Sequence, residues 1–76
     1  MTADEVKSLL SESFADAEIS VVGEGAKFDV SIVSDVFEGK RPVPRQQLVY
    51  GALNAHIQSG EIHAVTMNLK TKTEAA

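Results

Sequence analysis

The sequence predicts an α+β fold in which a three-stranded mixed sheet is covered by helices on one face. Three patterns favour this fold class: a helical apolar spacing near the start, two alternating segments around a glycine-rich turn, and a second helical segment followed by a third alternating one. The expected order is helix, strand, strand, helix, strand. Because 76 residues suffice for one small core, we expect a single domain over residues 1–70.

The first helix is predicted over residues 3–15. Thr2 and Glu5 have the spacing of a capping box, in which each side chain accepts a hydrogen bond from the other residue's backbone amide. Apolar residues then recur at the spacing of one helix face, at Val6, Leu9, Leu10, Phe14 and Ala17.

The next two segments predict a pair of antiparallel strands. Apolar residues alternate with polar ones on both sides of the sequence Gly23-Glu24-Gly25-Ala26, which has the composition of a hairpin turn. The alternating apolar positions are Ile19 and Val21 before the turn, and Phe28, Val30 and Ile32 after it.

A second helix and a third strand complete the predicted fold. A helical turn is expected at residues 34–37 and an exposed, irregular basic loop at 39–42, followed by a helix that starts at Pro44 and ends near Gly60. The third strand is expected over residues 62–69. Residues 71–76 have no apolar periodicity, so we expect this C-terminal tail to fray.

The helix between the second and third strands constrains their arrangement. If these strands pair, they must run parallel, and the right-handed connection then places both long helices on one face of the sheet. Val65, Met67 and Leu69 are expected to line that face, and His63 shares their parity.

Charge and composition narrow the function classes. The net charge of −4 is uneven, with nine acidic and two basic residues in 1–38 but five basic and two acidic residues in 39–76. Affinity for an anionic partner is therefore expected in the second half, although chance scatter of charge is an equal alternative. Without cysteine, disulfides and thiolate metal sites are excluded. No signal peptide or membrane span is recognisable, so the expected compartment is the cytoplasm, or an organelle matrix after processing. The order of helices and strands leads us to expect a monomer.

The two histidines have different interpretations from the residues alone. His56 falls in the last turn of the predicted second helix, where the helix dipole favours a cation, so it is interpreted as structural or incidental. His63 is either a core histidine bonded to the backbone or to a carboxylate such as Glu61, or a functional residue. With so few candidate groups, an enzyme and a zinc site are both disfavoured.

Several motifs resemble the BolA family, and its shorter IbaG/YrbA-like branch in particular. They are the "VFEGK" turn, Arg45-Gln46-Gln47 leading into Val49-Tyr50, and the run Ile62-His63-Ala64-Val65. The resemblance covers nearly the whole chain. It implies a BolA-like fold with the topology of a type II KH domain, in agreement with the predicted order of elements.

The resemblance also implies a function without catalysis. BolA-like proteins pair with monothiol glutaredoxins and bridge a 2Fe-2S cluster with glutathione, in iron homeostasis or cluster delivery, and His63 corresponds to the family's histidine ligand. Many members offer a second histidine or cysteine in the hairpin loop, where this chain has Gly25-Ala26-Lys27-Phe28. Either another group completes the site or the cluster is weakly bound.

Nucleic-acid binding is the alternative function, because the implied fold resembles a KH domain and some BolA-like proteins regulate transcription. KH domains clamp the nucleic-acid backbone with a GXXG loop, but here Pro42 replaces the second glycine. Lys40, Arg41 and Arg45 are the candidate phosphate or partner contacts. Because the net charge is negative, weak and salt-dependent association is expected.

Overall fold

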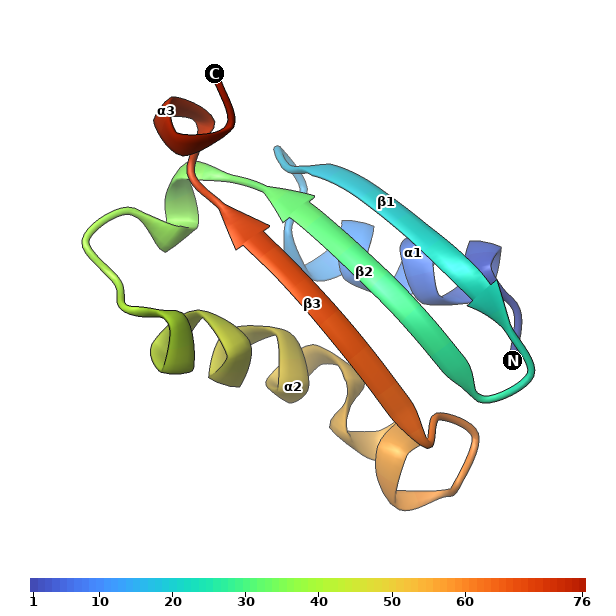
Figure 1. The fold of residues 1–76 in the computed structure, drawn as a ribbon. Coiled ribbons are helices and arrows are strands. Elements are labelled where there is room, and N and C mark those ends of the chain that lie inside the picture. The colour runs from blue at the N-terminus through green and yellow to red at the C-terminus, as the bar shows by residue number, and fades with distance from the viewer.

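The secondary structure follows the order that the sequence predicts, with one additional short helix at the end (Figure 1). The computed structural model describes all residues from 1 to 76. Its elements are α1 (Ala3–Ser13), β1 (Glu18–Glu24), β2 (Lys27–Val33), the 3-10 turn η1 (Asp35–Phe37), α2 (Pro42–Gln58), β3 (Ala64–Lys70) and α3 (Lys72–Ala75).

The three strands form one mixed sheet in the order β1-β2-β3. β1 and β2 pair antiparallel, whereas β2 and β3 pair parallel, with Lys27 opposite Ala64 at one end and Val33 opposite Lys70 at the other. In Figure 1, α1 lies behind β1 and β2, and α2 forms the crossover that returns the chain to β3. The predicted mixed sheet with a one-sided helix layer is confirmed.

The core lies between this helix layer and one face of the sheet. Along β2, Phe28, Val30 and Ile32 are buried while Lys27 and Asp29 are exposed, as expected for a strand with one covered face. Partly buried residues of β3 pack against the core as predicted, namely Val65, Met67 and Leu69. The buried apolar residues are Val6, Leu10, Phe14, Phe28, Val30, Ile32, Phe37, Val49, Leu53 and Ile62.

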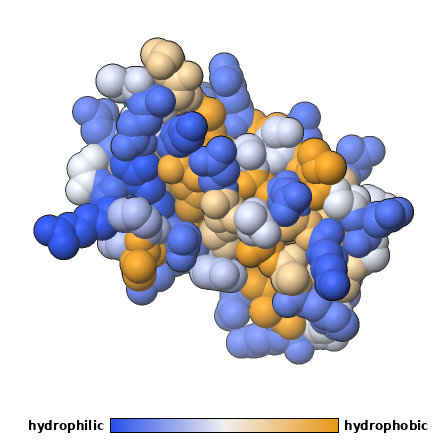
Figure 2. All heavy atoms as spheres, in the orientation of Figure 1, coloured by the Kyte–Doolittle hydropathy of each residue, from blue (hydrophilic) through white to orange (hydrophobic).

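The opposite face of the sheet carries mainly small and polar side chains. Ser20, Asp29, Thr66 and Asn68 alternate with the core residues, and Val22 is an exposed apolar exception, with 65% of its surface accessible. Figure 2 shows hydrophilic side chains distributed around apolar atoms over the face in view. No helix has the length and apolar character required to cross a membrane.

The observed starts of α1 and α2 can be compared with the starts predicted from the sequence. The capping box of α1 is confirmed, because the Glu5 amide donates to Thr2 Oγ1 at 3.2 Å and the Thr2 amide donates to Glu5 Oε1 at 3.0 Å. The second helix begins at Pro42 and not at Pro44 as expected. The preceding Arg41 is extended, and a proline is tolerated in the first turn because the amide it lacks has no intrahelical partner there.

The tail differs from the expectation that residues 71–76 fray. Thr71 is buried and caps α3, since its Oγ1 accepts from the Glu74 amide at 3.1 Å while its own amide donates to Glu74 Oε1 at 2.9 Å. This capping box orders the short segment without any apolar periodicity. The tail is therefore part of the folded domain.

Candidate functional site

His63 lies in the connection between α2 and β3 and not within a strand, as the predicted strand over residues 62–69 would require. Because β3 begins at Ala64, the alternation of the strand does not extend to His63, whose side chain is exposed. The neighbouring Ile62 is 1% exposed and belongs to the core. The buried Ile62 thus anchors the connection and leaves His63 at the surface.

The backbone of His63 is fixed by the hairpin between β1 and β2. The amides of His63 and Ala64 both donate to the carbonyl oxygen of Ala26, at 2.8 and 3.1 Å. In the parallel register, Lys27 lies directly opposite Ala64. The structure therefore brings His63 beside the Gly25-Ala26-Lys27 segment of the hairpin, although 37 positions separate His63 from Ala26 in the sequence.

The imidazole of His63 is open to a partner. It makes no hydrogen bond within the chain, and its immediate neighbour Gly60 has no side chain to cover it. A Cβ added at Gly60 would lie 3.8 Å from His63 Nε2, so even a small side chain would contact that nitrogen. Gly60 also has a φ of +85°, a left-handed conformation that favours glycine. A neutral imidazole in this setting can offer a lone pair to a metal.

The interpretation of His63 as a core histidine bonded to Glu61 is wrong. The ring is exposed, and Glu61 instead interacts with His56, whose Nδ1 lies 3.1 Å from Glu61 Oε1. His56 occupies the last turn of α2 as predicted, and its contact with Glu61 shows that the side chain is engaged within the chain. Hydrogen bonding from His56 and then from Ser59 lowers the pKa of Glu61 below its usual range.

Of the three candidate basic contacts, two are free and one is engaged. Lys40 and Arg41 are exposed just before α2. Arg45 has only 12% of its side chain exposed, and its Nε donates to the Lys40 carbonyl at 2.8 Å. Its Nη1 donates to the Leu69 carbonyl at 3.1 Å, and both terminal nitrogens contact Glu74, at 2.6 and 3.2 Å. The expectation of an open Arg45 in a basic patch is therefore not met.

The Arg45 interactions join α2 to three other elements, two of which are distant from it in sequence. The guanidinium carbon also lies 6.0 Å from the centroid of the buried Phe37 ring, so Arg45 connects α2 with η1, β3 and α3. Sequence reasoning missed this role because Glu74 is 29 positions away and no local pattern couples the two residues. The only available signal was the Thr71 to Glu74 capping-box spacing in the tail.

The Arg45 contact predicts a specific pH dependence of stability. Hydrogen bonding from Arg45, followed by the Thr71 backbone, lowers the pKa of Glu74 from 4.5 to about 2. A carboxyl group with a lowered pKa stabilises the fold fully above its unfolded pKa, and this contribution is lost as the pH falls from 4.5 toward 2. Glu74→Gln is expected to destabilise the protein at pH 7, by a margin that shrinks on acidification.

Urea unfolding of both proteins at pH 7 and pH 3 measures this margin, with the exposed Glu12→Gln as a control of equal charge change. A margin that stays constant between the two pH values would contradict the assigned Glu74 interaction.

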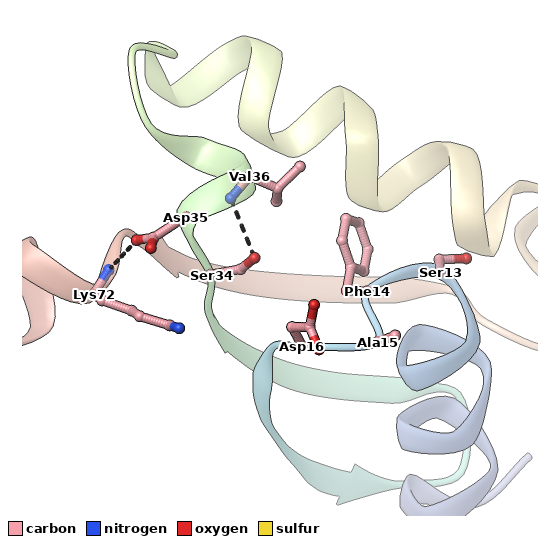
Figure 3. A pocket seen from close by; sticks show the side chains of 8 residues that line it. All are labelled: Ser13, Phe14, Ala15, Asp16, Ser34, Asp35, Val36 and Lys72. Atoms are coloured by element: carbon pink, nitrogen blue, oxygen red, sulfur yellow. Dashed lines mark hydrogen bonds between the residues drawn. The ribbon is translucent and has the colours of Figure 1, made fainter.

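A separate shallow cavity lies at the other end of the sheet (Figure 3). It has a volume of about 370 Å³ and lies between the end of α1, η1 and Lys72. Two of its polar side chains already serve the backbone, since Ser34 Oγ accepts from the Val36 amide at 3.2 Å and Asp35 Oδ1 accepts from the Lys72 amide at 3.4 Å. The parallel register places His63 beside the opposite end of β2, so this cavity is not part of the histidine site.

The residues around His63 could supply only one ligand, the His63 imidazole, to a metal group held between this chain and a partner. The chain holds no cluster of three or more histidine, aspartate or glutamate side chains suited to a metal ion, and it contains no cysteine. An imidazole nitrogen can replace a thiolate on one iron of a 2Fe-2S cluster. The exposed ring of His63 fits this role, provided that a partner supplies the remaining ligands.

The fold defines a class of small α+β domains in which helices cover one face of a mixed sheet. The site adds a histidine that is exposed beside the end of that sheet. Residues 8–74 match the family described as BolA-like protein. The chain therefore belongs to the BolA-like family. Its similarity to acid stress protein IbaG of Escherichia coli strain K12, at 37% identity over 100% of this chain and 90% of that protein, supports the IbaG/YrbA-like branch.

Other relatives agree with this assignment. An uncharacterised protein from the rpoN-murA intergenic region of Acinetobacter guillouiae is 53% identical over 97% of this chain and 89% of its own length. Among solved structures, a BolA protein homologue from Coxiella burnetii has a TM-score of 0.87 and 30% identity, covering 99% of this chain and 96% of that one. The BolA fold predicted from the motifs is thus confirmed.

Proposed function

We propose that this chain is a non-catalytic partner of a monothiol glutaredoxin and that the two proteins share a 2Fe-2S cluster. His63 is the ligand from this chain. The observation that carries the proposal is the exposed His63 ring on a backbone held by the Ala26 carbonyl. A fixed backbone limits the positions that the ring nitrogens can occupy, which favours metal ligation.

The remaining ligands come from the partner in this proposal. Lys27 is the hairpin residue nearest in register to the start of β3, and a protonated lysine has no lone pair for iron. The glutaredoxin and its glutathione supply the thiolates that this chain lacks. When bound, the cluster provides an iron–sulfur unit that the complex can sense or deliver.

The biological setting of the proposal is iron homeostasis or cluster delivery during stress. The relative from Escherichia coli is named acid stress protein IbaG and matches this chain over its full length, which supports the link to a stress response. The family resemblance supports the link to iron, because BolA-like proteins form complexes with monothiol glutaredoxins that bridge a 2Fe-2S cluster.

Co-expression of the chain with a monothiol glutaredoxin from the same organism tests this function. We expect a coloured one-to-one complex whose native mass includes one 2Fe-2S cluster and glutathione. A chain that purifies alone and colourless beside an intact glutaredoxin would overturn the proposal. The matched control is the glutaredoxin expressed without this chain, which separates a shared cluster from one bound by the glutaredoxin alone.

Nucleic-acid binding remains the second candidate because Lys40 and Arg41 are exposed beside the start of α2. Arg45 is held by Glu74, which leaves Lys40 and Arg41 as the phosphate contacts. With two such contacts, the logarithm of the binding constant should fall with the logarithm of the salt concentration with a slope of only about −2. Retention of the chain on DNA with a much steeper slope or with sequence selectivity, in the absence of a glutaredoxin complex, would place this function first.

A further inference from the structure

We propose that His56, Ser59 and Glu61 form a brace that holds the imidazole of His63 in position for the partner's iron. These three are positioning residues, because they act through the connection and not on the cluster. This inference rests on the proposed function and adds to it the residues that prepare the ligand before the partner arrives. Neither the sequence nor the family resemblance assigns these three residues a role in positioning His63.

The brace is a closed group of side-chain contacts at the end of α2. Glu61 Oε1 is shared by His56 Nδ1 at 3.1 Å and by Ser59 Oγ at 2.9 Å. The Ser59 hydroxyl also lies 3.0 Å from the His56 carbonyl, so its single proton has two acceptors within reach. The Glu61 amide in turn donates to Ser59 Oγ at 3.4 Å. Each of the three residues is thus linked to both of the others.

Backbone hydrogen bonds also tie the connection to the end of α2. The carbonyl of His56 accepts from the Ile62 amide at 3.1 Å, and the Gly60 amide donates to the Ile57 carbonyl at 3.2 Å. The left-handed Gly60 lets the chain reverse within this short segment. The brace therefore fixes the residues on the N-terminal side of His63, while the Ala26 carbonyl fixes its own amide.

The connection needs such a brace because little of it is buried. Ser59, Gly60, Glu61 and His63 are all exposed, and only Ile62 packs into the core. An exposed connection with only one buried side chain loses order easily, whereas a metal ligand must be held in a narrow range of positions. Hydrogen bonds that order the backbone before His63 narrow the positions its ring can occupy, although none of them touches the ring itself.

The brace contacts lie near the protein surface, so they order the connection locally and add little to the stability of the whole domain. The Glu61 side chain is 51% exposed and the His56 side chain 29% exposed. Solvent weakens interactions at such positions, so their removal changes the free energy of unfolding little. A role in positioning His63 is distinguishable from a role in folding for this reason.

The test uses His56→Ala and Glu61→Gln in the full chain, with all variants measured at one fixed near-neutral pH. Gln58→Ala is the matched control for His56→Ala, since it is exposed in the same last turn of α2. Glu24→Gln is the control for Glu61→Gln, because it is an exposed glutamate at the hairpin end of the sheet. Two readouts are measured: hydrogen exchange of the His63 amide in the free chain, and the rate at which a chelator removes iron from the glutaredoxin complex.

We expect both brace variants to accelerate exchange at His63 and to increase the rate of iron loss by less than the roughly tenfold that loss of a direct partner of the ligand would cause, with both controls unchanged. In a His63→Ala background the cluster is absent, so exchange at residue 63 is the only readout, and the same acceleration is expected there because the brace holds the backbone and does not contact the imidazole. Exchange at residue 63 that neither brace variant accelerates, or iron loss from the complex that neither variant changes, would overturn the brace. If the wild-type complex holds no cluster, the proposed function fails, and unchanged exchange at His63 in the free chain then overturns the brace separately.

Discussion

Replacing His63 by alanine is expected to leave the fold intact and to remove the shared cluster from the glutaredoxin complex. The side chain is exposed and makes no hydrogen bond, so its loss should change the free energy of unfolding by no more than about 0.5 kcal/mol. The cluster, in contrast, loses the one ligand from this chain. Iron and sulfide content per complex, together with visible absorption at matched protein content, measures the effect.

The control for this substitution follows from the structure. The sequence alone makes His56→Ala the obvious comparison, but His56 contacts Glu61 in the connection that carries His63. Gln58→Ala is the better control because its side chain is exposed and makes no hydrogen bond. Binding of the two proteins is not a sufficient readout, since association without a cluster can use other surfaces. A His63→Ala complex with wild-type iron content and absorption would show that His63 is not the ligand.

Replacing Phe37 by alanine is expected to have the largest effect on stability. Phe37 is fully buried, its ring centroid lies 6.0 Å from that of Phe14, and the Arg45 guanidinium lies 6.0 Å from its centroid. Truncation of a buried phenylalanine costs about 3–5 kcal/mol, through lost burial and the cavity that remains. A domain of this size has a total stability of roughly 4–11 kcal/mol, so the variant should unfold at far lower urea concentration.

Two companion variants separate loss of packing from other causes. Phe37→Leu fills most of the space and should cost clearly less, about 1–2 kcal/mol. Val36→Ala changes a neighbouring side chain that is 44% exposed and should have little effect. A Phe37→Ala protein whose urea midpoint equals that of Val36→Ala would contradict the position of Phe37 at the centre of the core.

The elements of the fold were predictable because their signals are local. The alternation of Phe28, Val30 and Ile32 defines the face of β2 that is buried, and the glycine-rich turn before them defines the hairpin. The capping box at Thr2 defines where α1 begins. Once a helix separates the last two strands, the parallel pairing and the one-sided helix layer follow from the short list of allowed connections.

The contacts of Arg45 could not be predicted from such signals. Its partner Glu74 lies in a tail with no apolar periodicity, and the pairing exists only after β3 has brought the tail beside α2. The same limit applies to the start of α2, where Pro42 and Pro44 both suit a first turn and the extended Arg41 decides between them. Long-range packing and backbone conformation decide these details, and neither is encoded in residue spacing.

The candidate site was only partly predictable. From the residues alone, His63 had two open interpretations, and the family resemblance favoured the ligand. Exposure of the ring depends on where β3 begins, because a start at Ile62 would have placed His63 in the strand and a start at Ala64 leaves it outside. The contact between His56 and Glu61 is close in sequence, but only the reversal of the chain at Gly60 brings the two side chains together.

Nitrogen hyperfine spectroscopy on the reduced glutaredoxin complex tests the central claim most directly, namely that His63 binds the shared cluster. The chain is labelled with ¹⁵N in its two histidines and combined with unlabelled glutaredoxin. We predict strong coupling from one directly bound ¹⁵N nucleus in the wild type, its retention in His56→Gln, and its loss in His63→Ala. A wild-type spectrum without strongly coupled ¹⁵N, or one that His63→Ala leaves unchanged, would contradict the assignment.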